Sequence, residues 1–363
     1  MDKLSIAIVV ESLHTKGGVE RRTTELAKGL LSAGHEVHVY ANRWDPAVAE
    51  GLEYHRIPML KLGRAIKPLS FAWFAGKTIP KSGYDLVHTQ ARIYQYDLAT
   101  LGVGVHRAYL DALGIKARNR FDRAVLRIER AMFDLGAGRR LITNSQKCKG
   151  ELIDYYRFPE ERIHVVHNGV DSDHFRPRPE IREAARGEFD LSPEDVAVLF
   201  VGPGFRRKGL DTLIQASKVL PGNVKLLVVG KGKRDDYEDS QRLIWLGQCS
   251  SMENCYAAAD IFALPTRYDP FANSTMEALS SGVPVVTTTL NGVSEILQDG
   301  ENGLVIGPND PDALADRLRE LSEKPDLRER IGAAGREAIR PYTWQNATEN
   351  TMAVYETFLA EKA

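Results

Sequence analysis

Cysteine is scarce in this sequence. The three cysteines, Cys148, Cys249 and Cys255, have spacings that fit neither a zinc site nor a disulfide framework. We therefore expect all three to be structural, in a protein of a reducing compartment. Long hydrophobic runs are missing as well: the apolar stretch 6–10 stops at Glu11, and none approaches the roughly 20 apolar residues that span a bilayer. These absences predict a cytoplasmic protein with neither a secretion signal nor a membrane span.

Net charge is also small, at −1, but it conceals an uneven distribution. Residues 1–172 carry 26 Lys and Arg against 19 Asp and Glu, whereas residues 173–363 carry 22 against 30. The basic excess is concentrated between Arg107 and Lys149, with 11 basic and 4 acidic residues. This segment fits either a solvated helix face or a surface that meets anionic lipid or phosphate. Nucleic acid is disfavoured because no recognition motif accompanies the charge.

The order of predicted elements repeats along the chain. A length of 363 residues exceeds what one hydrophobic core usually supports, so two domains are expected. "SIAIVV", "HTKGGVERRTTELAKGLLSAG" and "HEVHVYA" predict strand, helix and strand, and "VAVLFVG", "PGFRRKGLDTLIQASKVLPG" and "NVKLLVVG" repeat this order about 190 residues later. The turn-rich stretch 167–180 marks the boundary. We therefore predict an α/β fold with two facing, doubly wound Rossmann-like domains and a ligand cleft between them.

The glycine loops do not fit a dinucleotide-binding fingerprint. The loop 202–207 lacks the third glycine and the loop 230–232 is shorter, so a dehydrogenase is disfavoured. Gly17 and Gly18 precede a predicted helix and could bring backbone N–H groups close to a phosphate or a sugar, with a simple tight turn as the alternative.

The stretch "FRRKGLDTLIQA" places Arg206, Arg207 and Lys208 at the start of a predicted helix, whose N-terminus is already partially positive. A bound polyanion would resolve this repulsion, and an arginine with a lysine suits a diphosphate. The alternative is a merely basic loop.

Two carboxylates surround another predicted helix start, in "DPFANSTMEALSSGVPVV" (269–286). Ser274 and Glu277 fit a capping box, in which Glu277 reaches back to a backbone N–H. Capping leaves Asp269, upstream of Pro270, unexplained. In the other interpretation the helix N-terminus receives phosphates, and both acids point toward hydroxyl groups of the ligand because phosphates would repel them.

Together these segments resemble the retaining glycosyltransferases of family 4, which have the GT-B fold. The resemblance runs nearly end to end and rests on "GGVERRTTELAKGLLSAGHEVHVYA", "VVHNGVDSDHF", "VGPGFRRKGLDTLIQA", "AAADIFALPTRYDPFANSTMEALSSGVPVV" and "NGVSEILQDGENGLV". Within the family, "RRKG" and the compact length are most similar to the lipopolysaccharide core glucosyltransferases. The resemblance implies an acceptor domain at 1–170, a nucleotide-sugar domain at 171–340, and a C-terminal helix within 341–363 that crosses back to the first domain.

The resemblance also implies a reaction. A hexose, glucose from UDP-glucose, would pass with retained configuration to a glycan or glycolipid, without metal or further cofactor. An anionic membrane surface, the inner face of the plasma membrane, is an expected partner. The alternatives are a sugar-nucleotide epimerase of similar fold and a non-catalytic nucleotide-sugar-binding subunit.

Site residues are carried over by position. Arg207 and Lys208 would contact the diphosphate, Asp269 the sugar and Glu277 the ribose. The family usually has two glutamates here and a glycine where this chain has Ala272. His106, in "GVGVHRAYL", is a catalytic candidate or an ordinary histidine, in a loop without the family's acidic residue. The other expected substrate-binding residues are Gly17, Gly18, Gln248, Ala272, Asn273 and Ser274.

Asp171 and Asp173 resemble the acid-any-acid triplet with which many sugar-nucleotide enzymes hold a metal. Because they follow "HVVHNGV" in the predicted interdomain link rather than a strand end, we expect no metal there.

Overall fold

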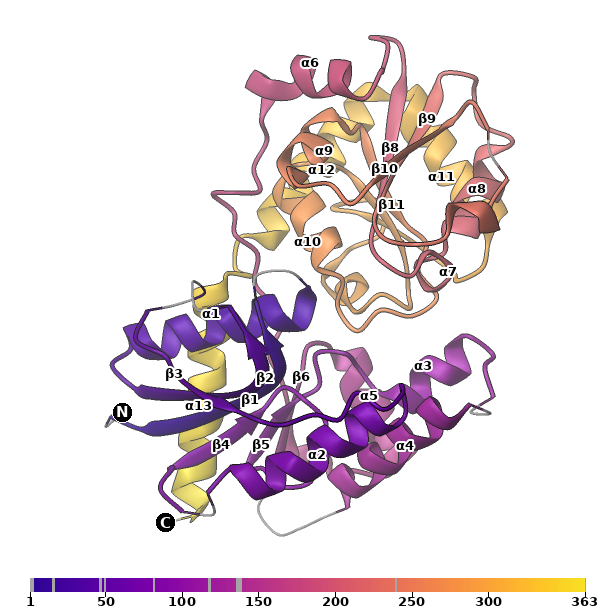
Figure 1. Ribbon diagram of the computed structural model, residues 1–363. Helices are drawn as coiled ribbons and strands as arrows, with labels where there is room; N and C mark the ends of the chain where they lie inside the picture. The colour runs from indigo at the N-terminus through magenta and orange to yellow at the C-terminus, as the bar shows by residue number, and fades with distance from the viewer. Residues whose placement is uncertain are drawn as a thin grey trace. The chain divides into compact units, whose positions relative to one another are not determined.

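The structure, a computed structural model, describes residues 3–14, 17–45, 48, 50–80, 82–116, 119–134, 139–238 and 240–362. The chain forms two compact units, one made of residues 1–169 and 344–363 and the other of residues 170–343 (Figure 1). Each unit contains one parallel sheet flanked by helices. The predicted α/β class with two Rossmann-like units is therefore confirmed.

The first unit has a seven-stranded sheet in the order β3-β2-β1-β4-β5-β6-β7. Its interior strand β1 (Ser5–Leu13) contains an apolar run with Ile6 and Ile8 fully buried, as expected for a strand covered on both faces. Its strands are β1 (Ser5–Leu13), β2 (Glu36–Trp44), β3 (Glu53–Arg56), β4 (Leu86–Thr89), β5 (Leu98–Thr100), β6 (Arg140–Thr143) and β7 (Ile163–Val165). Its helices are α1 (Gly18–Ser32), α2 (Ile66–Thr78), α3 (His106–Ala112), α4 (Arg120–Phe133), α5 (Gln146–Tyr156), the 3-10 turn η2 (Glu160–Arg162) and α13 (Trp344–Lys362).

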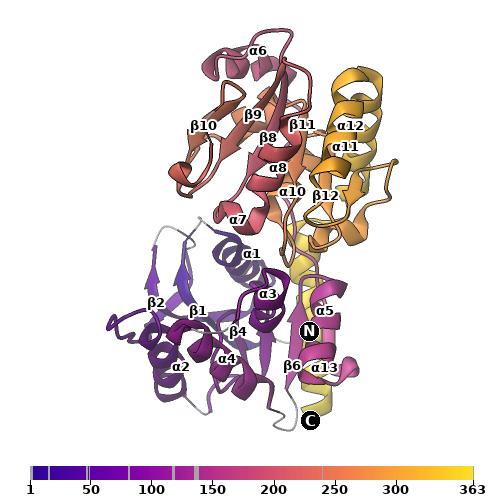
Figure 2. The ribbon, with the colours of Figure 1, turned by 90° about the vertical axis from the view of Figure 1, so that its right-hand side faces the viewer.

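Helix α13 completes the first unit, although it follows the second in sequence (Figures 1 and 2). It packs on α1, where a Cβ added to Gly29 would lie 2.7 Å from Thr348 Cγ2. Its buried Tyr355 hydroxyl lies 2.6 Å from His88 Nδ1. Burial, together with the charge of Arg22, lowers the pKa of His88 to about 3. A neutral histidine of the sheet thus anchors the C-terminal helix through a hydrogen bond.

The second unit has a six-stranded sheet in the order β10-β9-β8-β11-β12-β13. Its strands are β8 (Val196–Val201), β9 (Val224–Val229), β10 (Leu243–Gly247), β11 (Ile261–Leu264), β12 (Val285–Thr288) and β13 (Leu304–Ile306). Its helices are α6 (Pro179–Glu188), α7 (Phe205–Lys208), α8 (Leu210–Ser217), α9 (Met252–Ala258), α10 (Asn273–Ser280), α11 (Pro311–Glu323) and α12 (Pro325–Ile339), with 3-10 turns η3 (Arg234–Asp236) and η4 (Gly292–Ile296).

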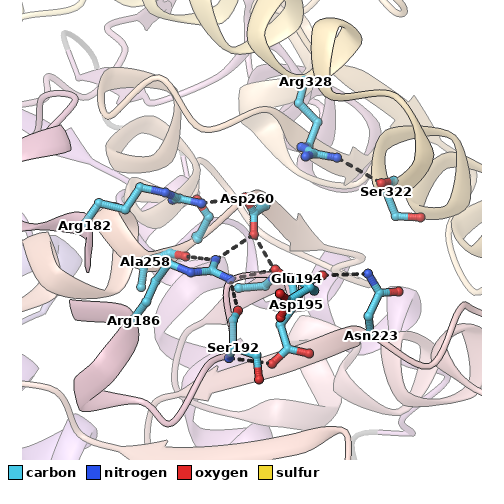
Figure 3. A network of polar contacts seen from close by, with 12 residues as sticks. Arg182, Arg186, Ser192, Glu194, Asp195, Asn223, Ala258, Asp260, Ser322 and Arg328 are labelled. Carbon is cyan, nitrogen blue, oxygen red and sulfur yellow. Dashed lines mark hydrogen bonds and ion pairs between the residues drawn. The ribbon is translucent and has the colours of Figure 1, made fainter. Parts of the chain in front are cut away.

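Helix α6, which opens the second unit, is fixed to it by a polar network (Figure 3). Arg182 and Arg186 meet the two carboxylate oxygens of Asp260 at 2.7 and 3.1 Å. Arg186 also donates to the carbonyl oxygens of Ser192 and Asp195, each at 2.7 Å. The partly buried carboxylate of Asp260, held by two arginines, therefore ties α6 to the segment between α9 and β11.

Candidate active site

The three basic residues predicted to hold a diphosphate, Arg206, Arg207 and Lys208, lie on α7, a single helical turn between two glycines. Gly204 and Gly209 have left-handed backbones, with φ of 74° and 79°, which glycine adopts without a side-chain penalty. A Cβ added to Gly209 would lie 1.9 Å from the carbonyl oxygen of Pro265, so a side chain does not fit there. This separate turn corrects the expectation that the residues 206–208 begin the longer helix, because α8 starts only at Leu210.

The turn directs Lys208 into the unit, while Arg207 stays partly exposed. The Lys208 side chain is 6% exposed, and its Nζ lies 2.7 Å from Asp269 Oδ2. Arg207 Nη1 donates to the same oxygen at 2.7 Å and to the carbonyl oxygen of Tyr268 at 2.9 Å. Gly202 leaves room for the lysine, because a Cβ there would lie 2.8 Å from Lys208 Cε. One buried carboxylate oxygen therefore holds two cations.

Burial and charge oppose each other in this cluster. Burial raises the pKa of Asp269, but Lys208 and Arg207 outweigh it and hold that pKa at about 2. Burial also lowers the pKa of Lys208, against the attraction of Asp269 and Glu277. With Asp269 ionised and both cations charged, the three side chains carry one net positive charge. Such a site attracts an anionic ligand.

Helix α10 begins at Asn273, with Ala272 as its N-cap and no side chain capping it. Ser274 lies inside the first turn, where its hydroxyl is 3.4 Å from the carbonyl oxygen of Val201. The capping-box interpretation is therefore wrong. The Ala272 N–H donates to Asn291 Oδ1 at 3.2 Å, which fixes the entry of the chain into the helix. The aligned peptide dipoles of the helix make this end of α10 partially positive.

Glu277 lies further along α10 and is held by a tyrosine. The Tyr256 hydroxyl, on α9, is 2.9 Å from Glu277 Oε2 and 3.1 Å from the carbonyl oxygen of Ser274. Because an ionised carboxylate is the stronger acceptor, we assign the hydroxyl hydrogen to Glu277. Sequence reasoning missed Tyr256, which lies 21 residues before Glu277 and carries no motif.

His106 lies in the first unit, at the start of α3. Its Nε2 is 3.1 Å from Asp122 Oδ1, and its backbone N–H donates to Glu129 Oε1 at 2.8 Å. Glu129 is fully buried. It forms an ion pair with Arg92 at 3.0 Å and accepts a hydrogen bond from the Tyr156 hydroxyl at 2.7 Å. Burial and the charge of Arg92 lower the pKa of His106, against the two carboxylates. Asp122 and Glu129, seven residues apart on one face of α4, thus place two carboxylates beside His106, and this spacing was the signal available in the sequence.

The remaining predicted residues have less defined surroundings. Gly17, with φ of 103°, is the N-cap of α1 and Gly18 is its first residue; both are exposed. Gln248 is exposed directly after β10. Asp171 Oδ1 accepts the N–H of His174 at 3.0 Å, which gives it a structural role in a turn. Asp173 is exposed.

Two cysteines that sequence spacing left unpaired lie together in the second unit. Cys249 and Cys255 are free thiols with their sulfur atoms 3.1 Å apart.

Two family models match the chain, one in each half. "Glycosyltransferase Family 4" matches residues 16–174 and "Glycosyl transferases group 1" matches residues 181–338. An uncharacterized glycosyltransferase of Methanocaldococcus jannaschii is 25% identical over 94% of both chains. A D-inositol 3-phosphate glycosyltransferase of Xylanimonas cellulosilytica is 30% identical, over 59% of this chain and 56% of its own length.

Solved structures agree on the fold. WaaG, a glycosyltransferase involved in lipopolysaccharide biosynthesis, superposes with a TM-score of 0.84 at 21% identity, covering 95% of this chain and 98% of its own. HepE of Anabaena, in complex with UDP-glucose, gives a TM-score of 0.75 at 19% identity, covering 98% of this chain and 100% of its own. The fold is that of the GT-B glycosyltransferases, and both family models describe glycosyltransferases. The chain belongs to the glycosyltransferases of family 4 and group 1.

Proposed function

We propose that this glycosyltransferase moves a hexose, glucose from UDP-glucose, to a glycan or glycolipid acceptor with retention of configuration. The observation that carries the proposal is the buried Lys208, paired with Asp269 next to Arg207. Holding an ammonium group in a protein interior is costly, and a binding site for a diphosphate accounts for it. UDP-glucose is the ligand named for HepE, and WaaG is described as involved in lipopolysaccharide biosynthesis. These names suggest a donor and an acceptor class to test.

In the proposed donor complex, the diphosphate lies against Arg207, Lys208 and the first N–H groups of α10. Asp269 keeps its Oδ2 on the two cations and offers Oδ1 to a sugar hydroxyl. Glu277, oriented by Tyr256, accepts the ribose hydroxyls. The sequence led us to expect that phosphates would repel both carboxylates, so that neither would lie near the diphosphate. In the proposed complex Asp269 does lie near it, because Asp269 is paired with the same cations that bind the phosphates.

The proposed chemistry is a front-face displacement. The bond between the anomeric carbon and the donor phosphate breaks while the acceptor oxygen bonds to the same face of that carbon. The leaving phosphate takes the acceptor's hydroxyl proton. Arg207 and Lys208 stabilise the charge that builds on the diphosphate, where one preorganised donor is typically worth about 3–4 kcal/mol. The two side chains and the helix end take the place of a divalent cation.

We assign the acceptor to the first unit. His106 is a candidate to orient an acceptor hydroxyl, because Asp122 fixes the orientation of its imidazole ring. Gly17 and Gly18 are candidates to approach a sugar closely with their backbone, since both lie at the exposed start of α1.

A glycolipid acceptor also calls for a surface that meets a membrane. The segment 60–77 exposes four large apolar side chains: Leu60 (45%), Leu62 (72%), Ile66 (41%) and Trp73 (55%). Its helix α2 packs on α4 (Figure 1). The exposed face of α4 carries four basic side chains, those of Arg120, Arg123, Arg127 and Arg130. Arg118, from the same basic segment 107–149, lies outside the described residues. No described helix is long and apolar enough to cross a bilayer.

We propose that this apolar and basic surface rests on anionic lipid, each cation contributing about 1 kcal/mol. Flotation with anionic and neutral vesicles at low and high salt tests this proposal. Salt-sensitive flotation with anionic vesicles is expected, and equal behaviour with both vesicle types contradicts it.

A panel of nucleotide sugars, tested first by thermal shift and then by product analysis, checks the reaction itself. A donor at 100 times its dissociation constant stabilises the protein by about 2.7 kcal/mol. Transfer requires that the sugar leave the nucleotide for an acceptor. Conversion of the donor sugar without acceptor would identify an epimerase, and binding without turnover a nucleotide-sugar-binding subunit.

A further inference from the structure

The first unit contains another group of side chains with metal-ligand chemistry, at the edge of its sheet. His38 of β2 lies beside Glu53 and His55 of β3, the outermost strand. One potential ligand atom from each of the three lies within 4.8 Å of the others, and a search of the described residues finds no second such group. The proposed transfer reaction uses none of these side chains.

The distances between these atoms approach those of ligands around one ion. His38 Nδ1 is 3.1 Å from His55 Nε2 and 3.3 Å from Glu53 Oε2. Around tetrahedral zinc, with ligands at about 2.0–2.2 Å, neighbouring ligand atoms are about 3.3–3.6 Å apart. An ion at this place therefore requires only small movements of the side chains.

Neighbouring groups prepare both imidazoles for this role. Glu36 Oε1 is 2.8 Å from His38 Nε2. A proton on Nε2 leaves the lone pair on Nδ1, the atom that faces His55, in the carboxylate–histidine arrangement that supports metal ligands. The His55 ring stacks on Tyr40 with centroids 4.5 Å apart.

We propose that His38, Glu53 and His55 bind one divalent transition-metal ion, zinc in the first instance, with water as the fourth ligand. Two imidazoles and one carboxylate suit zinc better than magnesium or calcium, which prefer all-oxygen sites. With the ion bound, His55 carries its single proton on Nδ1, which leaves the lone pair of Nε2 for the ion, and His38 keeps its proton on Nε2, toward Glu36. Because the ligands join two adjacent strands, the ion fastens the edge strand β3 to β2. Its role is structural and separate from the donor site.

Calorimetric titration of the untagged, EDTA-treated protein with ZnCl₂ tests this site. We expect the wild type to bind one equivalent of zinc. Zinc affinity should be at least about tenfold lower in the two ligand variants, Glu53→Gln and His55→Gln. It should be about tenfold lower in Glu36→Gln, because Glu36 orients the ligand His38. His174→Gln, a change to an exposed histidine of the second unit, is the matched control and should leave affinity unchanged. Glu53 is 66% exposed, so its variant should keep the fold. Glycosyl transfer should be the same in Glu53→Gln as in the wild type.

Cobalt(II) gives an independent reading, because its ligand-field absorption reports coordination directly. The bound spectrum should appear in the wild type and in His174→Gln, and weaken in Glu53→Gln and His55→Gln. Absence of saturable one-to-one binding in the wild type overturns the proposal. Equal zinc affinity in the wild type and both ligand variants overturns it as well.

Discussion

Replacing Asp269 by asparagine removes one charge from the donor cluster and almost no volume. In the wild type its Oδ2 lies 2.7 Å from both Lys208 Nζ and Arg207 Nη1. In the variant Lys208 keeps its buried position without the carboxylate that supports its charge. We expect the pKa of Lys208, already lowered by burial, to fall further, and the second unit to lose stability.

Two independent estimates set the size of this loss. The pKa of Asp269 falls from a model-compound 3.8 to about 2 in the fold, which corresponds to about 2 kcal/mol at neutral pH. Because that pKa is lowered, this contribution is present above about pH 4 and is lost as the pH falls toward 2. Removing one partner of a buried ion pair typically costs about 3–5 kcal/mol. We therefore expect Asp269→Asn to lower the free energy of unfolding by about 2–4 kcal/mol at pH 7.

Urea unfolding of three variants measures this effect. Asp269→Asn should be destabilised, and Lys208→Met combined with Asp269→Asn should recover much of the loss, because no charge is left buried alone. Asp316→Asn, which removes an exposed ion pair to Arg319 at 2.9 Å, should have almost no effect. The deficit of Asp269→Asn should narrow toward pH 10, as Lys208 loses its proton sooner in the variant than in the wild type. A deficit below about 1 kcal/mol, or no recovery in the double variant, would refute the buried pair.

The other predictions concern catalysis, donor binding and pH. Arg207→Ala and Lys208→Ala should each lower kcat/KM about 100-fold, because each removes a positive charge that stabilises the leaving diphosphate. Unchanged kinetics in both variants would show that neither residue stabilises the leaving group. Glu277→Gln should weaken the binding of UDP and of UDP-glucose alike, as measured by calorimetry. Tyr256→Phe should raise KM several-fold with little change in kcat, as measured by steady-state kinetics. Equal donor affinities in the wild type and both variants contradict the ribose contact. Activity should survive EDTA, whereas complete loss restored by Mg²⁺ or Mn²⁺ would require a metal at the donor. The free energy of unfolding should fall by about 1.4 kcal/mol per pH unit below pH 6.5, because His88, with a pKa of about 3 in the fold, takes up a proton only when the protein unfolds. In urea titrations, His88→Gln should remove this part of the pH dependence.

The two α/β units were predictable because their signals are local. Strands such as β1 and β8 are continuous apolar runs, and a strand buried on both faces requires such a run whatever surrounds it. The paired carboxylates and the basic turn were also recognisable as candidate site residues from their motifs. The sequence could not show that Lys208 is buried, since nothing in "RRKG" distinguishes an exposed lysine from one that a one-turn helix directs inward.

The errors and omissions share one cause, which is contact between distant parts of the chain. The capping box failed because Asn291, 19 residues away, holds the Ala272 N–H and sets where α10 begins. Tyr256 and the Cys249–Cys255 pair depend on how α9 packs. Asp122 and Glu129 reach His106 only once α4 has folded against α3. A spacing such as the seven residues between Asp122 and Glu129 indicates a shared helix face, but it does not show which residue that face contacts.

The central claim is that the buried lysine of the second unit binds the donor diphosphate. Calorimetric titration of UDP-glucose into the wild type and into Lys208→Met tests it most directly, because methionine keeps most of the buried unbranched chain and removes the charged ammonium group. We predict one saturable site in the wild type and at least about 100-fold weaker binding in the variant, with its unfolding midpoint measured alongside to show that it remains folded. Equal affinity in the two folded proteins would contradict the account.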